Sequence, residues 1–446
     1  MVEIKPLKGL RYNTDKIGII SEVLAPPYDI ISSSQNEELK ESNIFNFSFL
    51  TLPEASGQKN KYENANDIFA RWISEEVFVF ENVECLYLIE ELFVEGNIKK
   101  SFSGIVGLLK VEEYGKGKVL RHEKTLPKPK EDRLNLLKAC RANFEFIYTL
   151  YDDNDKKISV ILKKYKDTEP LIETCVQYDD SLKFKLWRID NEDDIKSIKD
   201  ILKPKSILIA DGHHRYETSR YYNEMTAAGT HEQRNAIRPE EYILSFFVAG
   251  NQEDILIHPT HRLIDFEKKI SSEDFLKEVE KYFMVESLRE FSASLIENKI
   301  KRRQEADKKK LAVCFNDKKC FVLTLKDSLE NIYDKLGILN DPFDMDFEYL
   351  DVNILHKLIL ENLLDDFSIK KIKYVHTVKE ALAELNGPGN LPEHEARTYD
   401  VCFVLNAPSI DTVEKLSFSG QIMPQKSTYF YPKPCSGLVV YKMNPL

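Results

Sequence analysis

The feature that most constrains the fold is a short apolar run that leads directly into a polar loop and then into a helix. Residues 206–210 are predicted to form a buried strand, residues 211–215 have the sequence Asp-Gly-His-His-Arg, and residues 216–226 have a helical pattern. A strand that turns into a helix is the repeating unit of α/β folds, and such folds bind ligands where the strand ends. The sequence therefore predicts an α/β protein with a candidate site at residues 211–215.

The same alternation of strands and helices continues on both sides of this loop. We predict a helix over residues 132–143, a strand over residues 144–151 and an apolar strand over residues 242–249. Residues 84–94 and 101–112 are apolar and flank turn-forming residues, which is typical of an antiparallel hairpin. The first ~120 residues are therefore expected to be strand-rich, and the fold class to be α/β or α+β.

A chain of 446 residues is too long to form a single hydrophobic core. We expect a strand-rich N-terminal region over residues 1–120, a core region over residues 121–265 and a C-terminal α/β domain over residues 266–446. The last of these starts with a predicted amphipathic helix over residues 271–283, and its tail is free to return to the active site.

The charge balance disfavours nucleic acid and membranes as the main partners. The chain has 63 basic and 74 acidic residues and a net charge of −11, whereas nucleic-acid binders usually carry a basic excess. No apolar stretch approaches the ~20 residues that cross a bilayer, and residues 1–5 lack the apolar core of a signal peptide. A cytoplasmic protein is expected.

The cysteines do not predict a metal site or a disulfide framework. The 7 cysteines are scattered, and no CxxC pair occurs. Only Cys314 and Cys320 lie close, where they flank a predicted hairpin formed by residues 311–315 and 320–325. The patterns GxSxG, HExxH and GxGxxG after a strand are also absent, so serine-hydrolase, zinc-peptidase and Rossmann functions have no support from the sequence.

The loop at residues 211–215 carries side chains that suit phosphate binding. Gly212 lets the backbone approach a ligand, and the following helix start supplies free N–H groups and a partial positive charge. Arg215 can hold two phosphate oxygens, and His213 and His214 add further donors. Asp211 can hold a magnesium ion or orient a histidine. A phosphate-binding loop is favoured over a helix cap with surface histidines.

Two other segments could contribute to catalysis or to phosphate binding. His122 and Glu123 lie near several cations and precede Arg133 on the next helix, so Glu123 is a candidate general base, although a solvated charge cluster is the more ordinary explanation. The run Lys426, Ser427 and Thr428 offers an ammonium and two hydroxyls to a phosphate. An ordinary terminal strand is an equal alternative there, and the P-loop pattern is absent.

Two more segments are candidates for lining the same pocket. Tyr28 and Asp29 follow paired prolines, which make a rigid extended segment. Thr260, His261 and Arg262 form a second polar run. A histidine three residues before His261 could form a metal pair with it, but no third ligand is apparent, so polar lining is favoured over a metal site.

Five segments, taken in order, resemble the domain-of-unknown-function family 1015, whose members are often labelled ParB-like. They are residues 25–31, 121–133, 211–215, 259–262 and 423–433. That family is similar in turn to the ParB/sulfiredoxin-like fold, which includes free-serine kinases. The resemblance implies a ParB/sulfiredoxin-like nucleotide-binding core.

The resemblance also implies roles for the candidate residues. Glu123, beside His122, would take the proton from a substrate hydroxyl, and residues 211–215 would hold nucleotide phosphates with Mg²⁺, helped by Arg133 and residues 426–428. The implied function is a small-molecule kinase of serine metabolism that transfers phosphoryl from ADP or ATP to a free hydroxyl, with L-serine as the favoured acceptor. Its partners would be a nucleotide and a small hydroxyl substrate; CTP and a homodimer stay open.

Other functions fit some of the same residues. A ParB-like regulatory or partition-type protein would bind a nucleotide without a small-molecule acceptor, and a third class would use the pocket for another anion. A DNA-binding version is disfavoured by the acidic balance and by the lack of a clear helix-turn-helix. Sulfinic-acid reduction is not expected, because His213 stands where sulfiredoxins have cysteine. A single active site requires Glu123 to lie within ~15 Å of residues 211–215.

Overall fold

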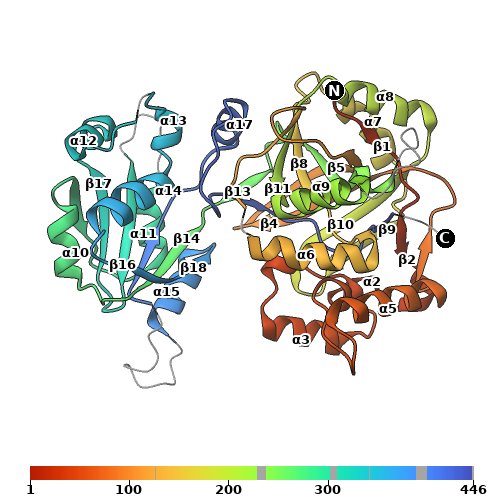
Figure 1. Cartoon of the computed structure of the whole chain (residues 1–446), viewed down its shortest axis with the longest axis horizontal. Helices are drawn as coiled ribbons and strands as arrows, with labels where there is room; N and C mark the ends of the chain where they lie inside the picture. Colours follow the sequence, from red (N-terminus) through yellow and green to blue (C-terminus); the bar gives the residue numbers. More distant parts are fainter. Residues whose placement is uncertain (126, 229–237, 302–308, 341, 388–398, 444–446) are drawn as a thin grey trace. The chain divides into compact units, whose positions relative to one another are not determined.

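The computed structural model describes residues 1–125, 127–228, 238–301, 309–340, 342–387 and 399–443. The chain forms two compact units (Figure 1). The first comprises Met1–Arg121, Thr125–Leu256 and Pro432–Leu446, and the second comprises His122–Lys124 and Ile257–Tyr431. Both mix helices and strands, as the sequence predicts.

The first unit is built on a large mixed sheet with the strand order β6-β11-β8-β12-β5-β4-β10-β9, in which β1 also pairs with β5. The strands are β1 (Ile4–Lys5), β4 (Leu86–Glu95), β5 (Ile98–Lys110), β6 (Val119–Leu120), β8 (Ile147–Tyr151), β9 (Ile172–Val176), β10 (Asp179–Ile189), β11 (Ile207–Asp211) and β12 (Tyr242–Ala249). β12 runs parallel to β8 and antiparallel to β5, so it is central and buried along its whole length. This position explains its unbroken apolar sequence.

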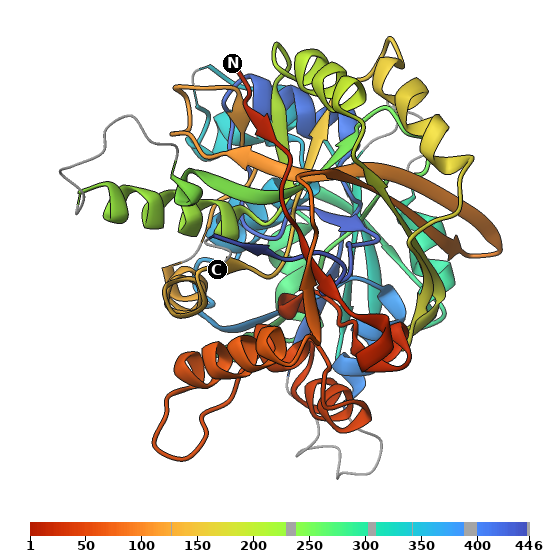
Figure 2. The same ribbon diagram turned by 90° about the vertical axis from the view of Figure 1, so that its right-hand side faces the viewer.

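Helices lie on two sides of this sheet (Figures 1 and 2). α7 (Lys157–Lys166) and α8 (Glu192–Leu202) pack their apolar residues against one face, in a core that includes Ile158 and Ile198. α6 (Pro127–Cys140) and α9 (His213–Ala228) contact each other, and α6 also contacts α5 (Lys61–Ser74).

The sequence predicts a strand-rich N-terminal region, but the structure corrects this prediction. Most of the first 74 residues are helical or irregular. α1 (Thr14–Ile17), α2 (Ile20–Val23), α3 (Ser33–Ser42), α4 (Ser48–Thr51) and α5 precede the first long strand, and only β2 (Leu10–Tyr12) and β3 (Phe78–Phe80) join β1 there. The cause is local. The side chains of Asn13, Ser32 and Asn60 accept hydrogen bonds from helix N-termini, and Phe69 and Trp72 have helical spacing in a second core.

The expected boundary near residue 120 lies inside the first unit. β5 pairs with β12 from Tyr242↔Lys110 to Val248↔Gly104, so strands from both sides of that boundary are neighbours in one sheet. The predicted hairpin is observed as β4 and β5, and the helix predicted over residues 132–143 begins earlier and ends at Cys140, before β7 (Ala142–Asn143).

The second unit is built on a six-stranded antiparallel sheet with the order β15-β17-β16-β19-β14-β18. Its strands are β14 (His261–Phe266), β15 (Phe283–Ser287), β16 (Lys310–Phe315), β17 (Cys320–Leu325), β18 (Ile369–Val375) and β19 (Val401–Val404). Its helices include α10 (Ser272–Val279), α11 (Ala293–Ile300), α12 (Leu329–Leu336), α14 (Asp351–Asn353), the π-helix η3 (Ile354–Leu363), α15 (Val378–Asn386) and α17 (Ile410–Phe418). α11 and α15 contribute to its core.

Two details of the second unit differ from expectation. The helix predicted over residues 271–283 ends at Val279, because Phe283 begins β15 and pairs with Leu325. Cys314 and Cys320 form a disulfide across the β16–β17 hairpin, with 4.2 Å between their Cα atoms. Cross-strand pairing brings these two cysteines together, as the predicted hairpin implies, but the disulfide itself was not expected.

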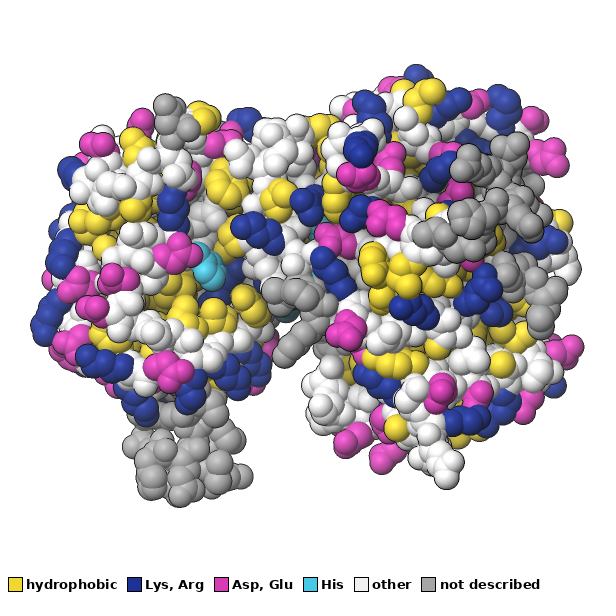
Figure 3. Space-filling view, viewed as in Figure 1, with side chains coloured by type: hydrophobic (Ala, Val, Ile, Leu, Met, Phe, Trp, Pro, Cys, Tyr) yellow, Lys and Arg dark blue, Asp and Glu magenta, His cyan; other side chains and the backbone are white. Residues whose placement is uncertain are grey.

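The surface carries both signs of charge. Lys and Arg side chains are interspersed with Asp and Glu over the drawn face of each unit (Figure 3). Within the described residues, no helix is long and apolar enough to cross a membrane.

Candidate functional site

Most of the predicted site residues, together with Glu145 and Lys433, lie in two clusters, one in each unit. We call the first the Asp211 cluster: Tyr28, Asp29, Arg133, Glu145, Asp211, Arg215 and Lys433. We call the second the Arg262 cluster: His122, Glu123, Thr260, Arg262, Lys426, Ser427 and Thr428.

Asp211 contacts two cations of the first cluster. It ends β11, where the pairing with β8 is irregular, and its two carboxylate oxygens face different cations. Lys433 Nζ lies 2.8 Å from Asp211 Oδ1 and 3.0 Å from Asp29 Oδ2, and Arg215 Nη2 donates to Asp211 Oδ2 at 2.6 Å. The Lys433 side chain is only 4% exposed. These contacts join the predicted segments 25–31, 211–215 and 423–433.

Gly212 shapes the turn between β11 and α9. Its φ of +93° disfavours a side chain, and a Cβ there would lie 2.9 Å from Ile147 Cγ2 and 3.2 Å from Arg215 Nε. The backbone N–H of Tyr216 donates to the Gly212 carbonyl at 2.9 Å, which opens the helix. Gly212 is therefore required both by conformation and by the close approach of Arg215.

Arg215 lies in the first turn of α9 and is held at both ends of its guanidinium. Nη1 donates to the Phe146 carbonyl, while Nη2 pairs with Asp211. Burial opposes its charge, but Glu145 and Asp211 outweigh burial and raise the pKa of its guanidinium. His213 and His214 begin the same helix; His213 is buried and His214 is half-buried.

Tyr28 and Glu145 lie close to these charged groups and contact each other. The Tyr28 N–H donates to Glu145 Oε1 at 2.9 Å, and the Ser436 hydroxyl donates to the same oxygen at 3.1 Å. Burial and the neighbouring Asp29 raise the pKa of Tyr28 to about 12, so its hydroxyl stays neutral. The Arg133 guanidinium lies 4.0 Å from the centre of the Tyr28 ring.

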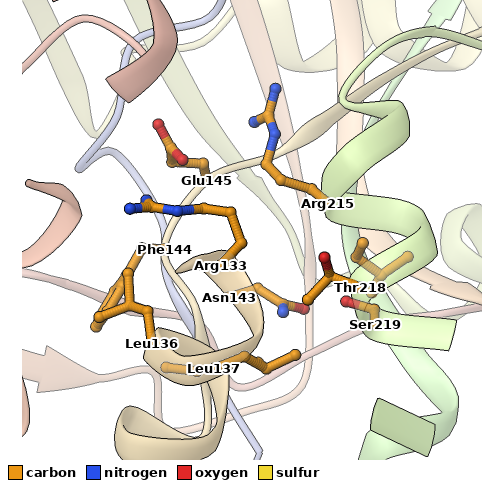
Figure 4. Close-up of a pocket in the computed structure, with 11 residues that line it drawn as sticks. Arg133, Leu136, Leu137, Asn143, Phe144, Glu145, Arg215, Thr218 and Ser219 are labelled. Carbon is orange, nitrogen blue, oxygen red and sulfur yellow. The ribbon is translucent and has the colours of Figure 1, made fainter. Parts of the chain in front are cut away.

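Arg133 and Arg215 line one pocket (Figure 4). α6 contributes Arg133, Leu136 and Leu137, and α9 contributes Arg215, Thr218 and Ser219 on the other side. The remaining lining residues are Ala142, Asn143, Phe144, Glu145 and Ile243. The Thr218 hydroxyl is buried there without a hydrogen-bond partner. The pocket thus combines apolar walls, two cations, the Glu145 carboxylate and an unused hydroxyl.

In the second cluster, His122–Lys124 pairs with the segment at Met423. The Met423 N–H donates to the His122 carbonyl at 2.8 Å, and the Lys124 N–H donates to the Met423 carbonyl at 3.2 Å. Glu123 Oε1 accepts the Lys426 N–H at 2.7 Å. His122 Nε2 and Thr428 Oγ1 are 2.8 Å apart. The predicted runs 122–123 and 426–428 therefore share one cluster.

Arg262 and His261 begin β14 and are buried. Arg262 Nη2 donates to the Lys426 carbonyl at 2.9 Å, and Nη1 donates to the Thr260 carbonyl. His261 Nδ1 accepts the Leu405 N–H at 3.3 Å. Burial, together with the charge of Arg262, lowers the pKa of His261 to about 3. His261 is thus a neutral structural group.

The residues present do not themselves make a magnesium site. Among the described residues, no group of three or more His, Cys, Asp or Glu side chains could hold a metal ion. Both oxygens of Asp211 already face Lys433 and Arg215, and a metal there would have to displace these cations.

Sequence reasoning missed several residues of the first cluster. Lys433 lies in the segment 423–433, where the sequence pointed only to residues 426–428, and Glu145 is a charged residue inside the predicted strand over residues 144–151. That charge in an apolar run was the available signal. Ser436, which contacts Glu145, and Thr218, which lines the pocket, lie outside the cluster and had no recognisable sequence pattern.

A family model described as "Protein of unknown function (DUF1015)" matches residues 4–352. This chain belongs to the DUF1015 family. The DUF1015 match includes Asp29, Glu123, Arg133, the loop 211–215 and Arg262, and it ends before the segment that carries Lys426 and Lys433.

Three solved structures show a distant likeness to this DUF1015 chain. A mutant free serine kinase in complex with ADP has 14% identity and a TM-score of 0.32, covering 70% of this chain and 84% of that chain. SbnI with a C-terminal truncation, from Staphylococcus aureus, has 13% identity and a TM-score of 0.34, with coverages of 76% and 87%. A conserved hypothetical protein from Pyrococcus furiosus has 12% identity and a TM-score of 0.33, with coverages of 72% and 90%. No curated protein matches the sequence.

Proposed function

We propose that this chain is a small-molecule kinase that transfers a phosphoryl group from ADP or ATP to a free hydroxyl, with L-serine as the first acceptor to test. The observation that carries the proposal is the pocket of the first unit, in which Arg133 and Arg215 stand beside apolar walls and the unpartnered Thr218 hydroxyl. A nucleotide combines an anionic phosphate chain with a flat, largely apolar base, and this lining matches both parts.

The Asp211 cluster provides preorganised cations for phosphate binding, each already paired with a carboxylate. Arg215 and Lys433 are fixed by Asp211 and Asp29, so their positions are set before a ligand arrives. The first turn of α9 adds backbone N–H groups next to Arg215. Phosphoryl transfer depends mainly on positioning and charge neutralisation, which a preorganised set of cations supplies.

Glu123 is proposed as the general base. Its carboxylate is oriented by the Lys426 N–H and lies 4.0 Å from His122 Nε2. In the reaction, Glu123 accepts the hydroxyl proton, the acceptor oxygen bonds to the terminal phosphorus, and the bond from phosphorus to its bridging oxygen breaks. The leaving nucleotide is AMP when the donor is ADP, and ADP when the donor is ATP.

The first test separates nucleotide binding from turnover. ADP, ATP and CTP are offered with magnesium, binding is followed by thermal shift, and phosphoserine is sought when L-serine is present. Glu123→Gln is expected to keep the nucleotide-induced shift and to lower the turnover rate about 100-fold or more, as loss of a general base does. Exposed Glu267→Gln is the matched control and should match the wild type.

Arg215→Gln should instead weaken nucleotide binding itself, because it removes a charged donor from the pocket. Normal turnover by Glu123→Gln would refute the role of that residue. The lack of any shift with all three nucleotides would refute the proposed function.

One observation favours a regulatory nucleotide-binding protein as the second candidate. Every residue of the Asp211 cluster and its pocket belongs to the first unit, so nucleotide binding there does not require Glu123. Nucleotide binding without product from L-serine or another hydroxyl compound would select this candidate.

A further inference from the structure

A second pocket lies within the second unit and is separate from the nucleotide pocket described above. Its polar lining residues are Thr260, Arg262, Lys309, Asp351, Asn406 and Ser427. They come from the start of β14, the starts of β16 and α14, the segment after β19 and the run 426–428. All belong to the second unit.

Arg262 is the unusual member of this pocket. It is 1% exposed, and β18 and β19 flank it through the pairs Arg262↔Tyr374 and Arg262↔Phe403. Its two Nη atoms donate to backbone carbonyls, whereas its Nε is buried without a hydrogen-bond partner. A buried cation is costly unless an anion compensates it.

No carboxylate in the described part of the chain forms an ion pair with Arg262. The carboxylate of the pocket, Asp351, has other partners. Its Oδ1 lies 3.5 Å from Lys309 Nζ, and its Oδ2 accepts hydrogen bonds from Asn406 N and Nδ2, both at 2.9 Å. The charges of Lys309 and Asp351 therefore cancel, and Arg262 gives the lining residues one net positive charge; Glu123, outside the lining, is a nearby carboxylate whose charge acts on Arg262. Burial lowers the pKa of Arg262 to about 10, which still leaves it charged at neutral pH.

Thr260 supplies a second unused donor. Its side chain is buried, and its hydroxyl has no hydrogen-bond partner, although its carbonyl accepts from Arg262. The guanidinium N–H and the hydroxyl are both buried without partners in one pocket. A monoanionic oxygen ligand would accept hydrogen bonds from both donors and would balance the single positive charge of the lining residues.

We infer that this pocket binds the carboxylate of the phosphoryl acceptor, with Arg262 Nε and the Thr260 hydroxyl as donors; this rests on the proposed kinase function. Lys426 relates the pocket to the base, because its carbonyl accepts from Arg262 and its N–H donates to Glu123. The acceptor is thus a small hydroxy acid or hydroxy amino acid, whose hydroxyl and carboxylate lie a few bonds apart.

The test measures acceptor binding to the full chain by calorimetry in the absence of nucleotide. The probes are L-serine, glycerate, ethanolamine and inorganic phosphate. Serine and glycerate both carry a carboxylate and are expected to bind, whereas ethanolamine keeps the hydroxyl, lacks the carboxylate and is expected not to bind.

Arg262→Gln should weaken serine and glycerate about 10- to 100-fold, as loss of a charged hydrogen-bond donor does. Thr260→Val keeps the shape and removes only the hydroxyl, and it should weaken them several-fold. Exposed Arg289→Gln is the matched control in the same unit and should leave binding unchanged. If Arg262→Gln does not fold, Thr260→Val decides the question.

Equal binding of serine and ethanolamine, no binding of either carboxylate, or unchanged affinities in the folded variants would overturn the inference. Arg262-dependent binding of inorganic phosphate alone would also overturn it and identify a phosphate pocket. Because no nucleotide is present, failure of the kinase reaction does not affect this result, and failure here leaves nucleotide binding by the first unit intact.

Discussion

At the scale of single residues, the cations Lys433 and Arg215 of the Asp211 cluster are neutralised by ion pairs with carboxylates rather than by solvent. Lys433 is almost fully buried, and it is tolerated because Asp29 and Asp211 both contact its ammonium. Arg215 is tolerated in the same way. This arrangement places Arg215 and Lys433 near the N-terminus of α9, where an incoming anion can compete with the carboxylates for the two cations.

Gly212 makes the first residue-scale prediction. Gly212→Ala should destabilise the first unit by about 2–4 kcal/mol, because a positive φ and a steric contact with Ile147 act together. Gly115→Ala is the matched control, since Gly115 has a φ of +81° but no atom within 4 Å of a Cβ. Urea unfolding should show the smaller loss, about 1–2 kcal/mol, for Gly115→Ala. Equal losses for the two variants would mean that the close approach of Arg215 and Ile147 has no energetic consequence.

At the scale of elements, a charged contact ties α5 to α6. Asp132 on α6 accepts hydrogen bonds from Lys61 Nζ at 2.6 Å and from the Tyr62 hydroxyl at 2.9 Å, and it pairs with Arg133. Burial opposes the charge of Asp132, but Arg133 and Lys61 outweigh it and lower its pKa to about 2. The same contact positions Arg133, which lines the pocket.

This lowered pKa predicts a pH-dependent contribution to stability. A carboxyl with a depressed folded-state pKa stabilises the fold above its unfolded pKa of 3.8 and loses that effect as pH falls towards about 2. Asp132→Asn should therefore cost about 1 kcal/mol at pH 7, after allowance for solvent screening, and almost nothing near pH 2. Urea unfolding across this range measures it, with the exposed Asp67→Asn as control. A cost that does not change with pH would contradict the assignment.

At the scale of the whole molecule, each unit has its own sheet and its own apolar core. Ile198 of α8 is buried in the first unit, and Ile296 of α11 is buried in the second. Units with separate cores can unfold in separate steps. The two tryptophans of the chain, Trp72 and Trp187, both belong to the first unit, so tryptophan fluorescence reports on that unit alone.

Separate unfolding gives the molecular-scale prediction. Ile296→Ala should cost about 2–5 kcal/mol in the second unit, shifting part of the circular-dichroism transition while the fluorescence midpoint stays in place. The matched Ile198→Ala should shift the fluorescence midpoint. If both variants move both signals together, the two units unfold as one.

The sequence predicted local elements better than contacts between distant residues. Periodicity and turn residues placed β4, β5, β11, β12 and the β16–β17 hairpin correctly, since these signals lie in neighbouring residues. The short helices α1 to α4 were missed because their caps and apolar spacing are weak over short elements, whereas the helical spacing of Phe69 and Trp72 does predict α5. Long-range partners were harder still: Glu145 and Lys433 had no local pattern that linked them to the loop.

By itself, the sequence determined the mixed α/β class, the strand-loop-helix at residues 207–228 and four segments within the family match, residues 25–31, 121–133, 211–215 and 259–262. Only the tertiary structure decided which segments meet: Asp29 and Lys433 with Asp211, and Glu123 with Lys426. Local dihedral preferences, caps and apolar periods are properties of adjacent residues. Contacts between residues hundreds of positions apart depend on strand order and on the closure of long loops, and no short stretch of sequence records these.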